Sequence, residues 1–116
     1  MTDFTYSTAT EMMARLRAGE VTSSQLLAQH IARVEQRDGP INAVVVRTFE
    51  AARERAAQAD AARAHGEDWG LLHGLPMTVK ESFDLPGTPT CWGFAEYKDN
   101  IAQQPAVAVQ RLLDAG

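Results

Sequence analysis

Signals that start and stop helices dominate the first half of the chain and constrain its fold more than any other feature. Thr8 with Glu11, and Thr22 with Gln25, have the capping-box spacing, in which two side chains satisfy free backbone N–H groups at a helix start. Apolar residues then recur at helical spacing in both segments, and a glycine follows each of them. The sequence therefore predicts a helical hairpin over residues 1–40.

The segments that follow alternate between strand-like and helix-like composition. Residues 41–46 (INAVVV) are rich in β-branched side chains and short, which predicts a buried strand. Thr48 is the expected N-cap of an alanine-rich helix over residues 49–65. A second short strand is predicted over residues 77–80, and a last helix over residues 105–116, with its proline in the first turn.

This order of elements predicts the α/β fold class, with N-terminal helices leading into the first strands and helices of a mixed sheet. The sheet is expected to be incomplete at the C-terminus, because a helix that follows a strand normally crosses over to another parallel strand. We interpret residues 1–116 as the N-terminal part of a single domain, with the hairpin over 1–40 and the start of the α/β core over 41–116.

Composition excludes several classes of protein. Fifteen acidic against eleven basic residues give a net charge of −4, with no basic stripe that would predict direct binding to nucleic acid. No apolar run approaches the roughly 20 residues that span a bilayer, and the N-terminus lacks a signal-peptide pattern, so we expect a cytoplasmic protein without membrane contact. Cys91 is the one cysteine and the histidines are scattered, so neither a disulfide nor a metal site is predicted.

Lys80 ends the predicted strand over residues 77–80 and is the first candidate for chemistry. In an open α/β sheet, ligand sites gather outside the carboxyl ends of the strands. As a residue type, however, a lysine at a strand end is more often a solvated charge. Its position alone therefore leaves both interpretations open.

The surrounding run LHGLPMTVKESFDLPGTPTCWG resembles the amidase signature family. In that family His-Gly-Ile/Leu-Pro precedes Val-Lys-Asp/Glu, and Gly-x-Pro-Thr-Thr follows. The positions that fit this pattern in order are Leu72, His73, Gly74, Leu75, Pro76, Val79, Lys80, Glu81, Gly87, Pro89 and Thr90. INAVVV and AVQRLLDAG also resemble family segments, so the resemblance covers nearly the whole chain.

The resemblance implies an amidase that hydrolyses a carbon–nitrogen amide bond of a small molecule without a cofactor. Family members use a lysine, a serine in a cis peptide and a nucleophilic serine, and Lys80 matches the lysine. A free lysine has a pKa of about 10.4 and an effective general base one of about 7 to 8, so the base needs a dry pocket. Glu81 and Asp84 would oppose that change if they faced Lys80, but strand alternation sends Glu81 to the other face.

The two serines of the family mechanism lie downstream of position 116 in the family. The serines of this chain, at positions 7, 23, 24 and 82, do not lie in a Gly/Ser-rich segment, so we expect the isolated chain to be inactive. Two alternatives stay open. The chain could be a non-catalytic scaffold or interaction fragment that self-associates through an uncovered sheet edge or helix face, or it could be part of an amidase like that of glutamyl-tRNA amidotransferase.

Local departures from the family pattern concern Cys91, which replaces a threonine, and Phe94, which replaces a serine. We interpret Cys91 as a packed thiol, and Trp92 and Phe94 either as lining a substrate channel or, more commonly for loop aromatics, as anchors to the core. His73 is interpreted as a buried histidine that fixes its loop by hydrogen bonding.

Overall fold

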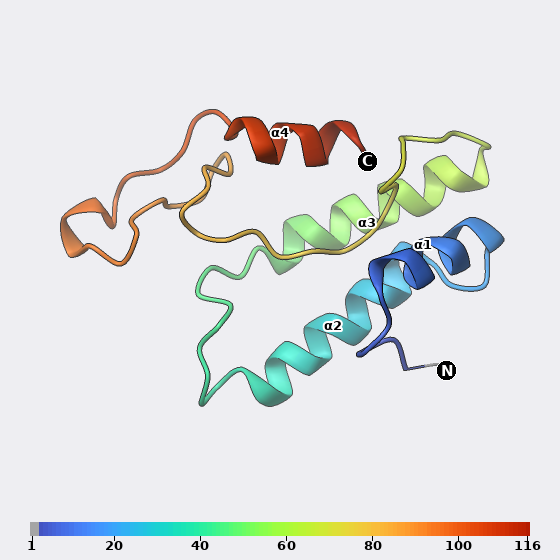
Figure 1. Cartoon of the computed structure of the whole chain (residues 1–116), viewed down its shortest axis with the longest axis horizontal. Coiled ribbons are helices and arrows are strands. Elements are labelled where there is room, and N and C mark those ends of the chain that lie inside the picture. Colours follow the sequence, from blue (N-terminus) through green and yellow to red (C-terminus); the bar gives the residue numbers. More distant parts are fainter. Residues whose placement is uncertain (1–2) are drawn as a thin grey trace. The chain divides into compact units, whose positions relative to one another are not determined.

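The computed structural model describes residues 3–116, which form four α-helices and one 3-10 helix (Figure 1). These are α1 (Ala9–Ala18), α2 (Ser23–Arg37), α3 (Phe49–Ala64), η1 (Ala95–Tyr97) and α4 (Val107–Asp114). The chain divides into two compact units. We call the described residues up to Pro76, together with Gly116, the N-terminal unit, and residues 77–115 the loop–helix unit.

Both predicted capping boxes are confirmed. The Thr8 hydroxyl accepts the Glu11 N–H at 3.2 Å, and the Glu11 carboxylate accepts the Thr8 N–H at 2.7 Å. The same reciprocal pair joins Thr22 and Gln25, at 3.1 and 2.9 Å. Because all four residues lie within one helical turn of their partners, their hydrogen bonds could be predicted from spacing alone.

The N-terminal unit is built around one hydrophobic cluster and a pair of packed helices. The buried members of the cluster are Phe4, Met12, Met13, Leu16, Val21 and Leu26, with Leu75 packed against them. Helix α2 packs against α3, whose buried residues are the alanines at positions 56, 59 and 62. These alanines recur every three residues, so α3 presents a single face of small side chains to the interior.

A carboxylate on α3 caps the start of α2. The two oxygens of Asp60 accept the N–H groups of Ser23 and Ser24, at 2.7 and 3.0 Å. The first N–H groups of a helix have no partner within the helix, and a carboxylate there is also favoured by the helix dipole. Asp60 therefore ties the two helices together by a polar contact in addition to their apolar packing.

The predicted α/β fold class is wrong for this chain, because the described residues form helices and turns and no sheet. The one β-type pairing in residues 3–116 is an isolated antiparallel bridge between Pro89 and Ile101. Residues 77–80, predicted as a strand, have no strand neighbour within the described residues. A strand exists only with a hydrogen-bonded partner, so β-branched composition was not sufficient to form one.

Residues 41–46 are also not a strand, and the reason is local. The Asp38 carboxylate accepts the N–H groups of Ala43 and Val44, at 2.7 and 3.3 Å, and Asn42 has a positive φ of 52°. These N–H groups, led by that of Ala43, and Arg47 hold the pKa of the Asp38 carboxyl below its usual range. Side chain to backbone hydrogen bonds thus replace the ladder that the composition predicted, and Ile41 is left 69% exposed.

The loop–helix unit consists of successive turns, η1 and α4. Helix α4 begins at Val107 with Ala106 as its N-cap, so Pro105 lies just before the helix and not in its first turn. The Ala106 N–H donates to the carbonyl of Asp84 at 2.9 Å, which fixes the helix start to the earlier turns. Across residues 3–116 the structure has no helix with the length and apolar character that crossing a membrane requires.

Candidate functional site

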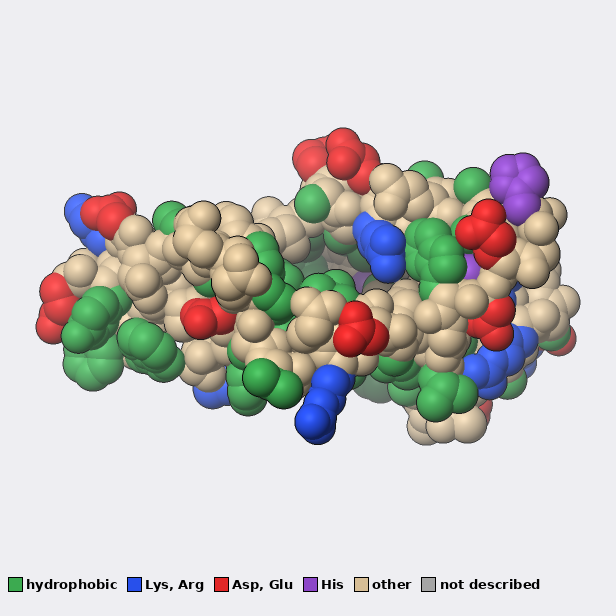
Figure 2. All heavy atoms as spheres, turned by 90° about the horizontal axis from the view of Figure 1, so that it is seen from above, with side chains coloured by type: hydrophobic (Ala, Val, Ile, Leu, Met, Phe, Trp, Pro, Cys, Tyr) green, Lys and Arg blue, Asp and Glu red, His purple; other side chains and the backbone are tan. Residues whose placement is uncertain are grey.

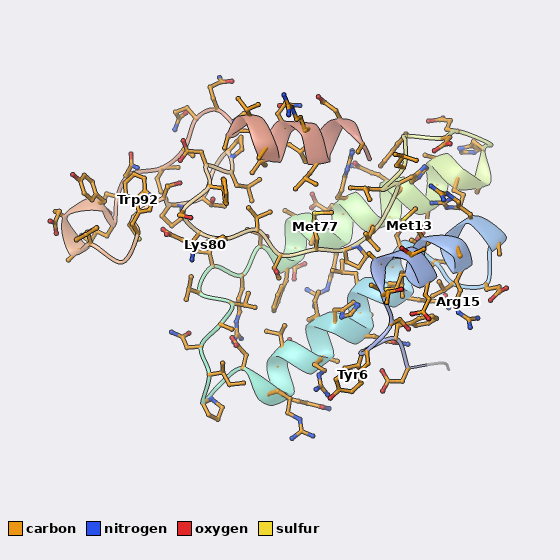
Figure 3. The ribbon with its side chains drawn as sticks, viewed as in Figure 1. Tyr6, Met13, Arg15, Met77, Lys80 and Trp92 are labelled. Atoms are coloured by element: carbon orange, nitrogen blue, oxygen red, sulfur yellow. The ribbon has the colours of Figure 1, made fainter. Side chains whose placement is uncertain are left out.

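Lys80 lies in the loop–helix unit, on the segment that leads from residue 77 into the turns (Figure 3). Its side chain is exposed. Its carbonyl accepts the N–H of Phe83 at 2.9 Å, so a turn begins at Lys80 and the predicted strand does not continue through Glu81. The described residues therefore place Lys80 at the start of a turn and leave it in contact with solvent.

Glu81 is bonded to a turn ten residues further along the chain. Its Oε1 accepts the Cys91 N–H at 2.5 Å and its Oε2 accepts the Trp92 N–H at 3.0 Å. The Cys91 thiol, the two N–H groups and the Lys80 ammonium all hold the pKa of the Glu81 carboxyl below its usual range, the thiol most strongly. Hydrogen bonds that favour the ionised form explain this direction.

The turn that Glu81 binds has a left-handed backbone. Trp92 has a φ of 51° and Gly93 a φ of 80°. Just before them, Thr90 is fully buried; its N–H donates to the Asn100 carbonyl at 2.9 Å, and its carbonyl accepts from the Asn100 Nδ2 at 2.8 Å. The Thr90 hydroxyl is buried with no hydrogen-bond partner among the described residues. The turn is thus held on both sides, by Glu81 and by Asn100.

The Tyr97 ring contacts two other aromatic side chains of this loop at the surface. Trp92 and Phe94 each meet the Tyr97 ring edge-on, with ring centroids 5.7 and 6.2 Å apart, and all three are exposed. Figure 2 shows hydrophobic side chains gathered at its left-hand end, where the segment around η1 lies. The expectation that loop aromatics pin their loop to the core is therefore wrong here.

His73 lies in the N-terminal unit and is fully buried. Its Nδ1 accepts the Trp69 N–H at 3.0 Å, and its Nε2 lies 2.8 Å from the Ala59 carbonyl oxygen. Because a carbonyl only accepts, Nε2 carries the proton and the ring is the neutral Nε2–H tautomer. The Trp69 ring stacks on it with centroids 4.8 Å apart. The interpretation of His73 as a buried histidine that fixes its loop is confirmed.

Sequence reasoning missed two polar residues of this region, Glu81 as a binder of the 90–93 turn and Asn100 as its second support. The available signal was the Trp92-Gly93 pair, since glycine commonly marks a left-handed turn whose N–H groups need an acceptor.

Among residues 3–116, no group of three or more histidine, cysteine, aspartate or glutamate side chains is arranged to hold a metal ion. Cys91 is a free, partly buried thiol.

Comparison with known proteins places these features in a family. The Amidase family model matches residues 25–116. The chain is 37% identical over 108 residues to an indoleacetamide hydrolase of Bradyrhizobium diazoefficiens, and the match covers 93% of this chain and 21% of that protein. It is 38% identical over 111 residues to a glutamyl-tRNA(Gln) amidotransferase subunit of Moorella thermoacetica, covering 96% of this chain and 23% of that protein.

A solved structure gives the same result at the level of the fold. The native peptide amidase of Stenotrophomonas maltophilia superposes with a TM-score of 0.88 and 29% identity, over 97% of this chain and 23% of that one. The chain thus spans about a fifth of the length of the curated relatives it matches. A family match over most of its residues, with the His73–Glu81 motif inside the matched range, shows that the chain belongs to the amidase signature family.

Proposed function

We propose that this chain supplies the catalytic lysine, Lys80, of an amidase that hydrolyses a carbon–nitrogen amide bond of a small molecule. The observation that carries the proposal is the place of Lys80 in the His73–Glu81 motif, within residues matched by the family model. In this proposal residues 1–116 are the N-terminal part of a single amidase domain, and the enzyme works in the cytoplasm without a cofactor.

The proposed mechanism uses two serines outside these 116 residues. Neutral Lys80 takes a proton from the nucleophilic serine through the bridging serine, whose peptide bond is cis, while the nucleophile forms a bond to the amide carbonyl carbon. The proton then passes to the departing nitrogen as the carbon–nitrogen bond breaks. Water releases the acid from the acyl-enzyme and restores the serine.

To act as a base, Lys80 must be shielded from water, and the described residues do not shield it, since its side chain is exposed. A lysine acts as a base only in its neutral form, which burial away from water favours. The proposal therefore assigns the apolar cover, like the serines, to parts of the amidase domain outside these residues. The buried, unpartnered Thr90 hydroxyl on the neighbouring turn is consistent with a polar neighbour of the same origin.

The isolated 116-residue chain is expected to show no amide turnover, because it carries the lysine without the serines. The measurement is ammonia release from indole-3-acetamide, a probe chosen from the hydrolase that the chain resembles. The Lys80→Ala chain is the matched control. Turnover by the purified chain that disappears in the Lys80→Ala variant would contradict this assignment of the serines.

A second candidate is an amidase subunit that feeds ammonia to a transferase acting on misacylated tRNA. The similarity to a glutamyl-tRNA(Gln) amidotransferase subunit favours it. The net charge of −4 neither favours nor opposes it, because partner subunits can supply the tRNA-binding surface. This function is distinguished from a free-standing amidase by glutamine-dependent activity that requires added partner subunits.

The non-catalytic alternative is a fragment that pairs with another copy of itself. No sheet edge is present in residues 3–116, so only the helix face remains: Val107, Leu112 and Leu113 of α4 are exposed, Val107 to 71%. Self-association is expected to raise the mass measured by light scattering as concentration rises. Leu113→Lys should lower that mass, whereas Gln110→Lys, which adds the same charge on the same helix, should not.

A further inference from the structure

Glu81 joins the segment that carries Lys80 to the 90–93 turn through both oxygens of one carboxylate. Each oxygen receives one backbone N–H, that of Cys91 at 2.5 Å and that of Trp92 at 3.0 Å. The segment from Glu81 to Cys91 is thereby closed into a loop, whose two ends are joined by this carboxylate. Any displacement of the turn is therefore transmitted to the residue next to Lys80.

The geometry of the turn suits an ionised carboxylate and not a neutral side chain. The N–H groups of two successive residues, Cys91 and Trp92, point toward one carboxylate, and such a pair forms a binding concavity for anions. A carboxylate accepts at both oxygens, whereas a glutamine amide accepts at one and presents an NH2 group at the other. Glutamine in the same position would face one of the two N–H donors with a donor of its own.

The engagement of Glu81 also matters for its neighbour. A glutamate beside a lysine would ordinarily pair with the ammonium and favour its charged form, which a base cannot use. Here both carboxylate oxygens are occupied by backbone donors, and the acid group is partly buried against the turn. The Lys80 ammonium acts on Glu81 only as a nearby charge, and it lowers the pKa of that carboxyl less than the hydrogen bonds do.

We propose that Glu81 is a positioning residue, which fixes the 90–93 turn to the Lys80 segment and keeps its own carboxylate on that turn. The proposal rests on the proposed role of Lys80 as the base. It assigns to Glu81 no contact with the substrate and no proton transfer.

The charged and titratable groups that act on the Glu81 carboxylate are the Cys91 thiol and the Lys80 ammonium. Because the folded pKa of Glu81 lies below the ordinary value of 4.5, the bonds to the turn are fully present above that value. They are lost as the pH falls through the lower folded pKa. The amide protons of Cys91 and Trp92 should therefore report the titration of Glu81 directly.

The experiment is a pH titration of the 15N-labelled 116-residue chain, followed at the Cys91 and Trp92 amide protons by NMR. In the wild type we expect both protons to move together, with one midpoint below that of an ordinary glutamate. In Glu81→Gln the common titration should vanish, and hydrogen exchange at both amides should become about tenfold faster, as expected when a charge-assisted hydrogen bond is lost. Glu96→Gln, which removes an equal charge from η1 of the same unit, should leave both signals unchanged.

The Lys80→Ala chain tests whether the Glu81 carboxylate senses the charge of Lys80 while it is bound to the 90–93 turn. Since the Lys80 charge lowers the pKa of Glu81, its removal should move the common amide midpoint toward higher pH. Amide protons of Cys91 and Trp92 that titrate independently, or that titrate together in Glu81→Gln as well, would overturn the proposal. Loss of the common titration in Lys80→Ala would also overturn it, because the bonds of Glu81 to the turn would then depend on the lysine and not on the backbone donors.

The amide titrations, combined with turnover measurements on the complete enzyme, distinguish a failure of this inference from a failure of the proposed function. If the complete enzyme loses turnover in Lys80→Ala but the two amides show no common titration, Lys80 is the base and the positioning role of Glu81 is wrong. If the common titration is present but Lys80→Ala leaves turnover intact, the base assignment fails, and the positioning role that rests on it fails with it.

Discussion

Gly74→Ala is expected to lower the free energy of unfolding of the N-terminal unit by about 3–4 kcal/mol, the sum of a strained backbone and an overpacked interior. Gly74 has a φ of 77°, which an alanine adopts only with strain. An alanine Cβ at this position would lie 1.9 Å from the Ser23 Oγ, 3.1 Å from the Ser23 Cβ and 3.3 Å from the Ala59 Cβ. Ser23 is itself buried, so it has little room to move away.

Gly66→Ala is the matched control for this change. Gly66 has nearly the same φ, 79°, but nothing lies within 4 Å of an added Cβ. Its cost should be the backbone strain alone, about 1–2 kcal/mol. Urea unfolding curves give both values. Adding Ser23→Ala to Gly74→Ala should recover part of the loss, because the closest overlapping atom is removed. Equal destabilisation by Gly74→Ala and Gly66→Ala would show that packing against Ser23 contributes nothing.

Helices could be predicted from this sequence because their signals are local. Thr8 bonds to Glu11 and Thr22 to Gln25 within a single turn, so spacing was enough. Thr48 is the N-cap of α3 as predicted, although its side chain makes no capping hydrogen bond. Element boundaries near glycines also followed from the sequence, as at Gly19, whose φ of 70° ends α1.

Strands could not be predicted, because strand formation depends on a partner elsewhere in the chain. The β-branched residues 41–46 fit a pleated, half-buried surface, but no such surface is available to them in residues 3–116. The N–H groups of Ala43 and Val44 are instead taken by the carboxylate of Asp38, a residue that the sequence analysis did not single out. The same applies to residues 77–80, where a turn begins at Lys80.

The candidate site was predicted in part. The motif around Lys80 is contiguous and therefore visible in the sequence, as was the structural part played by His73. The contact of Glu81 with Cys91 and Trp92 joins residues ten and eleven positions apart, and although the Trp92-Gly93 pair marks a turn, no local pattern identifies Glu81 as its acceptor. Trp92 and Phe94 of the same loop were interpreted as lining a substrate channel or as anchors to the core; they lie at the surface, which rules out the anchor, since packing depends on the tertiary structure.

Lys80→Ala is expected to lower the turnover number of the complete amidase by about 10³-fold, within the 10²–10⁴-fold range of general acid–base catalysis. Alanine cannot accept the proton of the nucleophile or return it to the leaving nitrogen. Lys80→Arg should be as severe, because a guanidinium stays protonated and offers no acceptor. The Michaelis constant should change much less than the turnover number, because the lysine takes part in proton transfer in the transition state and does not bind the substrate.

The measurement that tests the role of Lys80 most directly is ammonia release from a primary amide by the enzyme expressed from the complete reading frame. Wild type, Lys80→Ala and Lys98→Ala are compared, Lys98 being the other, exposed lysine of the loop–helix unit. We expect wild-type turnover for Lys98→Ala and a loss of about 10³-fold for Lys80→Ala, with both variants folded by circular dichroism. Turnover by a folded Lys80→Ala enzyme within tenfold of the wild type would contradict the assignment of Lys80 as the base.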